Sequence, residues 1–272
     1  MTRAAIVAAL LATVLPAAPA ATRAQYLMGT VCEIDADVSA DAAFAECQRI
    51  ESMLSTWRDD SELVRVNRGA TPSSELAALL ATTERYKRDT DGAFEPRIRA
   101  LLNKWGIRQG DGDGYEEGGF AKGYAIDRML AALSNAGATR AVINFGGQIG
   151  TLAKTDVTIA DPRHRDRAVV ALTLQQRSLS TSSTSEKPNH IIDPRSGRPV
   201  PARGSVSVIS DSALEADILS TALYVMGRER GLEWARAHHV TAIYIDNGSI
   251  EASAPVPGIR VLDAHFKIKG LN

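Results

Sequence analysis

The segment from Ala121 to Gly147, AKGYAIDRMLAALSNAGATRAVINFGG, joins a helical pattern directly to a strand-like one. Apolar residues recur at helical spacing through Gly123–Ala136, and a glycine follows at the expected end of the helix. The next residues, 139–145, are apolar and β-prone, and they end at Gly146-Gly147. We therefore predict a helix followed by a strand, with a glycine pair where the backbone can approach a ligand closely.

The flanking sequence extends this alternation in both directions. Upstream, the patterns predict a strand over Tyr26–Val38, helices over Asp41–Trp57 and Ser73–Asp89, and a loop-rich stretch after Asp91. Downstream, they predict strands over 155–160, 167–175, 188–193 and 203–210, helices over Ser212–Met226 and 228–239, and strands near 240–246 and 258–263. The alternation lacks the regular spacing of a parallel βα array, so we predict an α+β fold.

The composition indicates an ordinary soluble globular protein. Of 272 residues, 44% are hydrophobic, and 31 basic side chains oppose 32 acidic ones, which excludes a disordered or coiled-coil chain. The net charge of −1 offers no basic face for nucleic acid, so no nucleic-acid partner is expected. The two cysteines, Cys32 and Cys47, are too few for a disulfide scaffold or a cysteine-rich zinc site. They either pair with each other in an oxidising compartment or remain two buried thiols.

Residues 1–20 have the pattern of a secretory signal peptide. A single positive charge at Arg3 precedes an apolar run, and Ala18-Pro19-Ala20 has the form of a signal-peptidase site. A membrane anchor is the alternative, but the apolar run is interrupted at Pro16 and is short for a span. We therefore expect a signal peptide over 1–20, a single domain over 21–272, and a periplasmic protein.

Two glycine-containing motifs are candidates for phosphate binding. Gly118-Gly119 precede the predicted helix, and Lys122 lies in its first turn, where free backbone N–H groups and the helix dipole favour anions. The same pattern is also common turn chemistry. The strand ending at Gly146-Gly147 permits close approach of a ligand or simply forms a tight turn, and it lacks the dinucleotide fingerprint. The segment Asp161–Arg167, DPRHRDR, is interpreted as a solvated charged turn.

Two further motifs carry polar groups suited to catalysis. His190 stands just before a short apolar strand, where an imidazole can move a proton near neutral pH. Asp217 and Thr221 are four residues apart on one helix face, with Ser220 beside them. A carboxylate and a hydroxyl are hard oxygen ligands that suit Mg²⁺ shared with phosphate. The alternative is a threonine bonded to the carbonyl four residues back.

In this order, these pieces resemble the ApbE-type flavin transferases, the FAD:protein FMN transferase family. The resemblance runs from about Met28 to Tyr244. The matching stretches are Met28-Gly29-Thr30, Leu54–Leu63, Gly92–Pro96, Ala121–Asp127, Ile143–Gly147, His190–Pro194 with Gly197, and Ala216-Asp217 with Ser220-Thr221. Each motif alone is modest, but seven in register are specific.

The resemblance implies an enzyme that cleaves FAD at its pyrophosphate with Mg²⁺ and attaches FMN to a threonine or serine of an acceptor protein, releasing AMP. It implies mixed and antiparallel sheets with packed helices, in one compact domain of two closely associated lobes. By resemblance, His190 and Asp217 are catalytic, and Asp217, Thr221 and the backbone at Gly119 bind the metal. The residues implied to line the FAD site are Met28, Trp57, Ala93, Phe94, Glu95, Glu116, Lys122, Ile192 and Ser220. The implied acceptor is a membrane-bound or exported electron carrier.

Three differences from the family pattern stand out. The segment between Trp105 and Glu116 is short, Glu116-Glu117 replace an aspartate and an apolar residue, and Ser180–Ser185 replaces a Ser-Gly-Asp-Tyr-like stretch. Two other functions are therefore considered beside protein flavinylation. One is an FAD pyrophosphatase that uses water in place of the acceptor and gives FMN and AMP. The other is a non-catalytic periplasmic flavin-binding protein.

Overall fold

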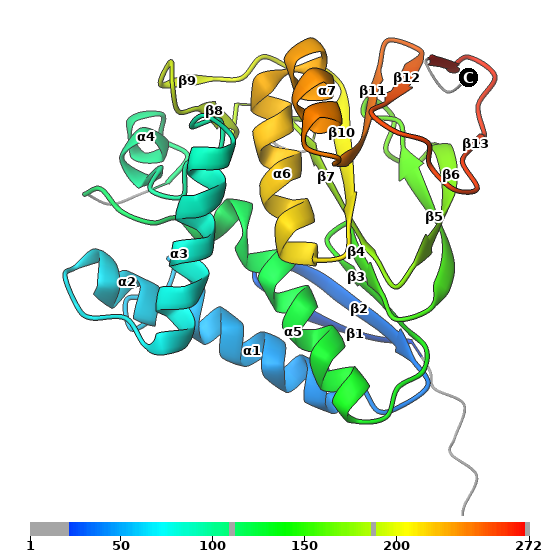
Figure 1. Ribbon diagram of the computed structural model, residues 1–272. Coiled ribbons are helices and arrows are strands. Elements are labelled where there is room, and N and C mark those ends of the chain that lie inside the picture. Colours follow the sequence, from blue (N-terminus) through cyan, green and yellow to red (C-terminus); the bar gives the residue numbers. More distant parts are fainter. Residues whose placement is uncertain (1–21, 109–111, 186–188, 270–272) are drawn as a thin grey trace, which may run out of the picture.

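A computed structural model describes residues 22–108, 112–185 and 189–269 of the chain (Figure 1). The predicted signal peptide lies outside these residues. Within them, a nine-stranded sheet has the order β1-β2-β3-β4-β7-β10-β11-β12-β14. Its neighbouring strands pair antiparallel, except that β12 and β14 are parallel. The strands of this sheet are β1 (Arg23–Leu27), β2 (Thr30–Ala36), β3 (Ala141–Phe145), β4 (Gln148–Thr151), β7 (Ser178–Ser183), β10 (Ser205–Ser210), β11 (Thr241–Asp246), β12 (Ser249–Ala252) and β14 (Lys267–Lys269).

Two smaller sheets and a set of helices complete the fold. A three-stranded sheet has the order β13-β6-β5, and β8 pairs with β9 in a short hairpin. Their strands are β5 (Lys154–Ala160), β6 (Ala168–Gln175), β8 (Ile192–Asp193), β9 (Arg198–Pro199) and β13 (Arg260–Val261). The helices are α1 (Asp41–Leu54), α2 (Glu62–Asn67), α3 (Ser74–Asp89), α4 (Arg99–Lys104), the 3₁₀ turn η1 (Glu117–Gly119), α5 (Ala121–Asn135), α6 (Ala213–Met226) and α7 (Arg228–Ala237). This architecture confirms the predicted α+β class.

The large sheet is the middle layer of the molecule (Figure 1). On one face, Ile34 and Phe145 of the sheet share a hydrophobic core with residues of the helices, among them Met129 of α5. On the other face, Ile209 and Ile243 share a second core with the three-stranded sheet. Burial of apolar surface on both faces therefore holds the three layers together.

Helix α6 is the central helix of the helical layer and is buried along most of its length. Its N-cap is Ser212, whose hydroxyl accepts the Glu215 N–H at 3.2 Å. The Asp127 carboxylate of α5 accepts the Ala213 N–H at 2.7 Å, which satisfies another free donor of the first turn. Glu215 does not complete a capping box, because its carboxylate accepts the Tyr86 hydroxyl of α3 at 2.7 Å. These bonds fix α3 and α5 around the beginning of α6.

Several sequence predictions need correction. The single strand predicted over Tyr26–Val38 is a hairpin of β1 and β2, because Met28 and Gly29 turn the chain with φ of 45° and 78°. Helices α2 and α4 and strands β4, β7, β12 and β14 were not predicted. Most of these elements are short, and β7 is rich in serine, so none has a strong periodic signal.

Cys32 and Cys47 are both buried free thiols in the structure. Burial raises the pKa of each thiol to about 12. Of the two alternatives that the sequence leaves open, the structure thus has the unpaired one. In the part of the chain that the structure describes, no helix combines the length and apolar character needed to cross a membrane.

Candidate active site

The centre of the candidate site is the crossing of α5 and α6 at Gly123. A Cβ atom at this position would lie 2.3 Å from the Ala213 carbonyl oxygen and 2.8 Å from the Asp217 Cβ, so only glycine fits without a shift. The close approach brings the Gly123 N–H to the Asp217 Oδ2 at 3.0 Å. This N–H is one of the free donors in the first turn of α5. The Asp217 carboxylate therefore lies at the N-terminus of a neighbouring helix.

Asp217 is a buried carboxylate, with 6% of its surface exposed. Burial raises its pKa, while the charge of Lys122 and the hydrogen bond from Gly123 act in the opposite direction. The burial effect is the largest, so the ionised carboxylate is under-compensated in the protein alone. A cation beside Asp217 would supply the missing charge.

Thr221 and Gly119 carry neutral oxygen atoms and contact each other beside the turn of α6 that follows Asp217. A Cβ at Gly119 would lie 3.7 Å from the Thr221 Oγ1, so the end of η1 contacts the Thr221 face of α6. The Thr221 hydroxyl donates to the Asp217 carbonyl at 3.2 Å, as in the alternative interpretation of this motif. That bond uses its hydrogen and leaves its oxygen lone pairs available to a metal. The three residues predicted to bind metal thus come from η1 and α6 and lie together.

The donor set favours a hard cation that shares its shell with a ligand. Among the described residues there is no cluster of three or more His, Cys, Asp or Glu capable of holding a metal. A site here has one carboxylate, one hydroxyl and a backbone carbonyl, which leaves positions for phosphate oxygens or water. Mg²⁺ is usually bound in this way, through one or two carboxylates plus substrate phosphate.

Ser220 is completely buried and faces the sheet. Its hydroxyl lies 3.2 Å from the Ser180 Oγ and 2.9 Å from the Ser182 Oγ, both on β7, and donates to the Asp217 carbonyl at 3.0 Å. Most of the serine-rich stretch that differs from the family pattern is therefore in strand β7, and it packs against the turn of α6 that carries the predicted metal ligands.

The segment 93–97 lies beside the residues that lead into η1. The Glu116 N–H donates to the Pro96 carbonyl at 2.9 Å, which ties the two segments together. Ala93 and Phe94 are buried, and the Phe94 ring packs 3.2 Å from the position of a Cβ at Gly119. Glu95 forms an ion pair with Lys87 at 2.6 Å. This predicted part of the FAD site therefore borders the predicted metal site.

Trp57 and Glu116 belong to a charged cluster that the sequence did not reveal. The Trp57 side chain is 74% exposed, and the Arg108 Cζ lies 4.0 Å from its ring centre. The same guanidinium forms ion pairs with Glu116 and with Glu117. Burial, reinforced by the nearby Glu117 carboxylate, raises the pKa of Glu116 to about 7. The only sequence signal for Arg108 is its position in the short segment between Trp105 and Glu116.

Two of the cluster's buried polar atoms, the Arg108 Nη1 and the Glu116 Oε2, have no hydrogen-bond partner among the described residues. Native proteins rarely leave such atoms unsatisfied. The Arg99 Nη1 lies 3.9 Å from the Glu116 Oε2, which is close enough for an ion pair but not for a hydrogen bond. The cluster thus retains one hydrogen-bond donor and one acceptor for a further ligand group.

The other predicted site residues lie on a turn and beside a hairpin. Met28 is in the β1–β2 turn, where its N–H donates to the Glu51 Oε1 of α1 at 2.8 Å. His190 is half-buried two residues before β8, and Ile192 is buried within β8. Of the strand predicted over 188–193, only β8 (Ile192–Asp193) is a strand in the described residues, and residue 188 lies outside them. The Trp105 indole N–H donates to the Gly197 carbonyl at 2.9 Å, which fastens α4 to the β8–β9 hairpin.

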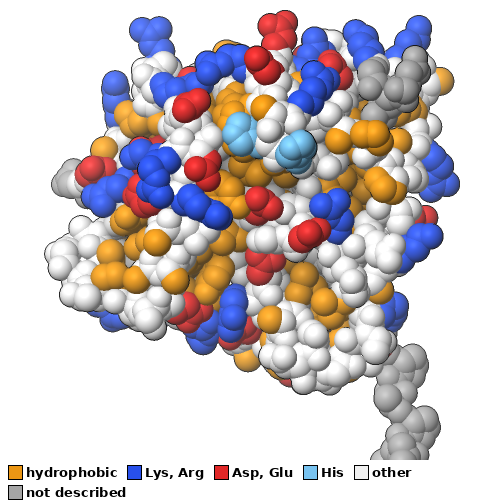
Figure 2. Space-filling model, viewed as in Figure 1, with side chains coloured by type: hydrophobic (Ala, Val, Ile, Leu, Met, Phe, Trp, Pro, Cys, Tyr) orange, Lys and Arg blue, Asp and Glu red, His pale blue; other side chains and the backbone are white. Residues whose placement is uncertain are grey.

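Figure 2 shows the molecule from the same side as Figure 1. Apolar side chains occupy much of the middle of this face, and charged side chains of both signs border them. A mixed border of this kind gives the face no strong single-sign potential.

The fold and this group of residues define a flavin-transferase-like α+β protein. The family model described as "ApbE family" matches residues 28–117 and 116–245, and the chain belongs to this family. Its curated relatives are enzymes. They include FAD:protein FMN transferases of Klebsiella pneumoniae, 27% identical over 79% of this chain and 85% of the relative, and of Treponema pallidum, 25% identical over 91% of each.

Solved structures share the fold. The flavinyl transferase ApbE of Pseudomonas stutzeri superposes with a TM-score of 0.74 at 23% identity, covering 84% of this chain and 91% of that one. The ApbE protein of Thermotoga maritima gives a TM-score of 0.76 at 21% identity, covering 88% and 96%. The predicted family is therefore confirmed, and so is the fold expected from it.

Proposed function

We propose that this chain is a Mg²⁺-dependent transferase that moves FMN from FAD to a threonine or serine hydroxyl of an acceptor protein and releases AMP. The activity of its curated relatives supports the transfer of flavin. The observation that carries the proposal for this chain is that the Asp217 carboxylate lies at the N-terminus of α5, while Thr221, one turn further along α6, contacts Gly119.

The donors fit a Mg²⁺ ion. Asp217 supplies a carboxylate whose negative charge is under-compensated, and Thr221 and Gly119 supply neutral oxygen atoms. When bound, such an ion neutralises charge that develops on the pyrophosphate oxygens during transfer. The first turn of α5, with Lys122, directs further positive charge toward the same phosphate groups.

In the proposed reaction, the acceptor hydroxyl oxygen bonds to the phosphorus of the FMN half. The bond from that phosphorus to the bridging oxygen breaks, and AMP leaves with this oxygen. The hydroxyl proton passes to a base, for which we propose His190, because a neutral imidazole accepts a proton near pH 7. Asp217 acts by holding the metal. The exposed face of Trp57 offers a stacking surface for a ring of FAD.

The cellular setting follows from the N-terminal sequence. We propose that residues 1–20 are a signal peptide, that residues 21–272 form the transferase domain, and that the protein works in the periplasm. The acceptor is then an exported or membrane-bound electron carrier with a threonine or serine at its flavinylation site.

Product analysis after incubation with FAD and Mg²⁺ distinguishes the three functions considered. A transferase forms AMP in proportion to the flavin-labelled acceptor, and it releases little free FMN. A pyrophosphatase releases FMN and AMP without any acceptor, and a binding protein leaves FAD unchanged although it binds it. Either of the last two outcomes, with an acceptor that a relative of the family labels, would reject the proposal. His190→Ala and Asp217→Ala should each reduce transfer by at least a hundredfold.

A further inference from the structure

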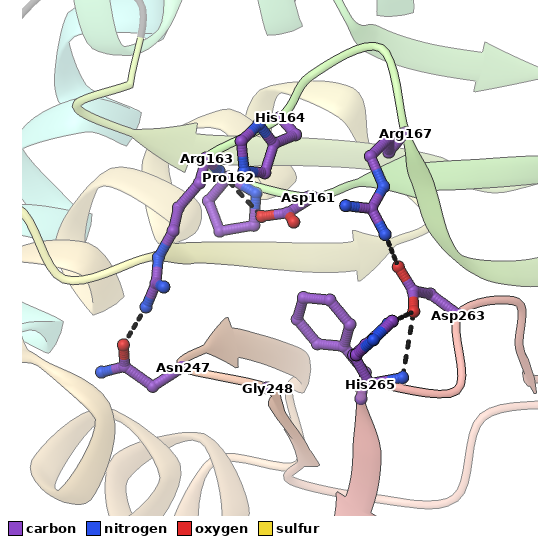
Figure 3. A pocket seen from close by; sticks show the side chains of 10 residues that line it. Asp161, Pro162, Arg163, His164, Arg167, Asn247, Gly248, Asp263 and His265 are labelled. Atoms are coloured by element: carbon purple, nitrogen blue, oxygen red, sulfur yellow. Dashed lines mark hydrogen bonds and ion pairs between the residues drawn. The ribbon is translucent and has the colours of Figure 1, made fainter.

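A cavity of about 240 Å³ lies away from the candidate active site, where three turns of the β-layers meet (Figure 3). The turns are the β5–β6 loop at 161–167, the β11–β12 turn at Asn247-Gly248, and the β13–β14 connection with Asp263, His265 and Phe266. None of its lining residues belongs to the candidate active site described above. The cavity is therefore a separate structural feature and does not depend on the proposed transferase activity.

Asp161 is the buried charged group of this cavity, with 5% of its surface exposed. Its Oδ1 accepts the Arg163 N–H at 2.8 Å. The described residues provide no hydrogen bond or ion pair to its Oδ2, and Figure 3 shows Asp161 and Arg167 facing the same space. The sequence interpretation of this loop as simply solvated is thus wrong for Asp161. The Arg163 N–H is the one hydrogen-bond partner of this carboxylate among the described residues, and the second oxygen is left to water or a ligand in the cavity.

Two guanidinium groups border the same cavity. Arg167 forms an ion pair with Asp263, and Arg163 donates to the Asn247 side-chain oxygen and lies 3.9 Å from Asp246. Both arginine side chains are about half-exposed, at 49% and 58%. Each guanidinium has five N–H donors, so each retains donors beyond these contacts.

The mixed charges select the class of ligand. A simple cation in this cavity would meet the positive charges of Arg163 and Arg167, and a simple anion would meet the negative charges of Asp161 and Asp263, because all four residues line it. A small molecule that carries both an ammonium and a carboxylate group can pair with a carboxylate and with a guanidinium group of the cavity. The volume is below the usual range of about 300–1,000 Å³ for drug-sized ligands, which indicates a small molecule.

We propose that this cavity binds a free α-amino acid, with its ammonium group on Asp161, its carboxylate on Arg167 and a small apolar side chain toward Phe266. Charge-assisted hydrogen bonds of this kind are stronger than neutral ones, and a carboxylate can be held by a guanidinium through two parallel bonds. Both charged ends of the ligand are needed for binding.

Titration of ¹⁵N-labelled full-length protein with L-alanine tests the proposal. The Arg163 N–H is the reporter, because it donates directly to Asp161. We expect a saturable shift of its NMR signal with L-alanine. L-Alaninamide, which lacks the carboxylate, and N-acetyl-L-alanine, which lacks the ammonium, should each bind at least tenfold more weakly.

Variants locate the site and separate it from effects on folding. Asp161→Asn should weaken L-alanine binding at least tenfold, and its amide oxygen still accepts the Arg163 N–H, so the loop stays in place. Arg167→Gln should weaken binding to a similar extent. Asp166→Asn, at an exposed aspartate on the same loop, should bind as the wild type does.

Three results would overturn the proposal. Equal binding of L-alaninamide would indicate a cation site, and equal binding of N-acetyl-L-alanine an anion site. No saturable shift with any of the three probes would mean that the cavity has no such ligand. Flavin transfer by Asp161→Asn is expected to equal that of the wild type, so failure of this proposal is distinguishable from failure of the proposed function.

Discussion

Replacing Asp217 by asparagine is expected to stabilise the metal-free protein and to abolish its response to Mg²⁺. The two side chains have nearly the same shape, and the amide oxygen still accepts the Gly123 N–H that now bonds to the carboxylate. What the change removes is a buried negative charge for which Lys122 and the helix terminus compensate only in part. A residue kept for metal binding thus costs stability when the metal is absent.

The size of the effect follows from two opposing contributions. Relieving an under-compensated buried charge is worth about 1–3 kcal/mol, and weakening the charge-assisted bond from Gly123 costs on the order of 1 kcal/mol. The net gain is therefore roughly 0–2 kcal/mol, centred on about 1 kcal/mol, which corresponds to a rise of ~2–4 °C in melting temperature for a domain of this size. For comparison, Mg²⁺ at 100 times its Kd stabilises the wild type by about 2.7 kcal/mol.

Thermal unfolding at several pH values, with and without Mg²⁺, measures both effects. Because the folded-state pKa of Asp217 is raised, the folded protein binds this proton more tightly than the unfolded chain does. The stability of the wild type therefore falls as pH rises through that pKa, and the advantage of the variant should be larger at pH 7 than at pH 4. Asp211→Asn is the control, since this aspartate precedes α6 but its side chain is 86% exposed.

Two results would refute this reasoning. A metal-free Asp217→Asn protein that melts below the wild type at pH 7 would show that the carboxylate contributes more through Gly123 and Lys122 than its burial costs. Equal stabilisation of both proteins by Mg²⁺ would show that Asp217 is not a metal ligand.

Three further predictions concern the same site. Gly123→Ala places a methyl group 2.3 Å from the Ala213 carbonyl oxygen. The resulting overlap should lower the free energy of unfolding, measured in urea, by about 1–3 kcal/mol. An unchanged free energy of unfolding would contradict the close crossing of α5 and α6. Glu116→Gln removes a carboxyl group whose pKa in the folded protein, about 7, is higher than its ordinary value of 4.5. Because the folded protein holds this proton more tightly than the unfolded chain does, the wild type should lose up to ~3 kcal/mol of stability between pH 4.5 and 8. The variant should not show this loss in urea titrations over the same pH range. A wild type that gains stability relative to the variant over this range would contradict that sign. Thr221→Ala should leave the metal-free stability within ~1 kcal/mol of the wild type but weaken Mg²⁺ binding at least tenfold by calorimetry, and unchanged Mg²⁺ affinity would exclude the hydroxyl as a ligand.

Long periodic elements were predictable from the sequence because their pattern is local. The helix predicted over Ser212–Met226 is α6, with Ser212 as its N-cap, and that helix alone places Asp217 and Thr221 on one face. The helix over Ser73–Asp89 was located equally well, with Ser73 as the N-cap. In each case the sequence pattern that marks the element also determines which side chains it presents together.

Features that depend on contacts between distant segments were not predictable in this way. Strand β7 is a polar serine-rich stretch that becomes a central strand because β4 and β10 pair with it on either side. Arg108 joins the Trp57 cluster only because the chain returns to α1 after α4. Asp161 lies in a charged turn, and its burial comes from turns about 85 and 100 residues further along the chain. No pattern within a short stretch of sequence predicts such contacts between distant residues.

Covalent labelling of an acceptor protein tests the proposed transferase activity most directly. The protein is incubated with FAD, Mg²⁺ and an exported electron carrier that has a flavinylation threonine, and the mixture is separated on a denaturing gel. A fluorescent acceptor band that requires Mg²⁺, disappears when the acceptor threonine is replaced by alanine, and is lost in Asp217→Ala is the predicted result. The absence of a band, while a relative of the family labels the same acceptor, would contradict the proposed function.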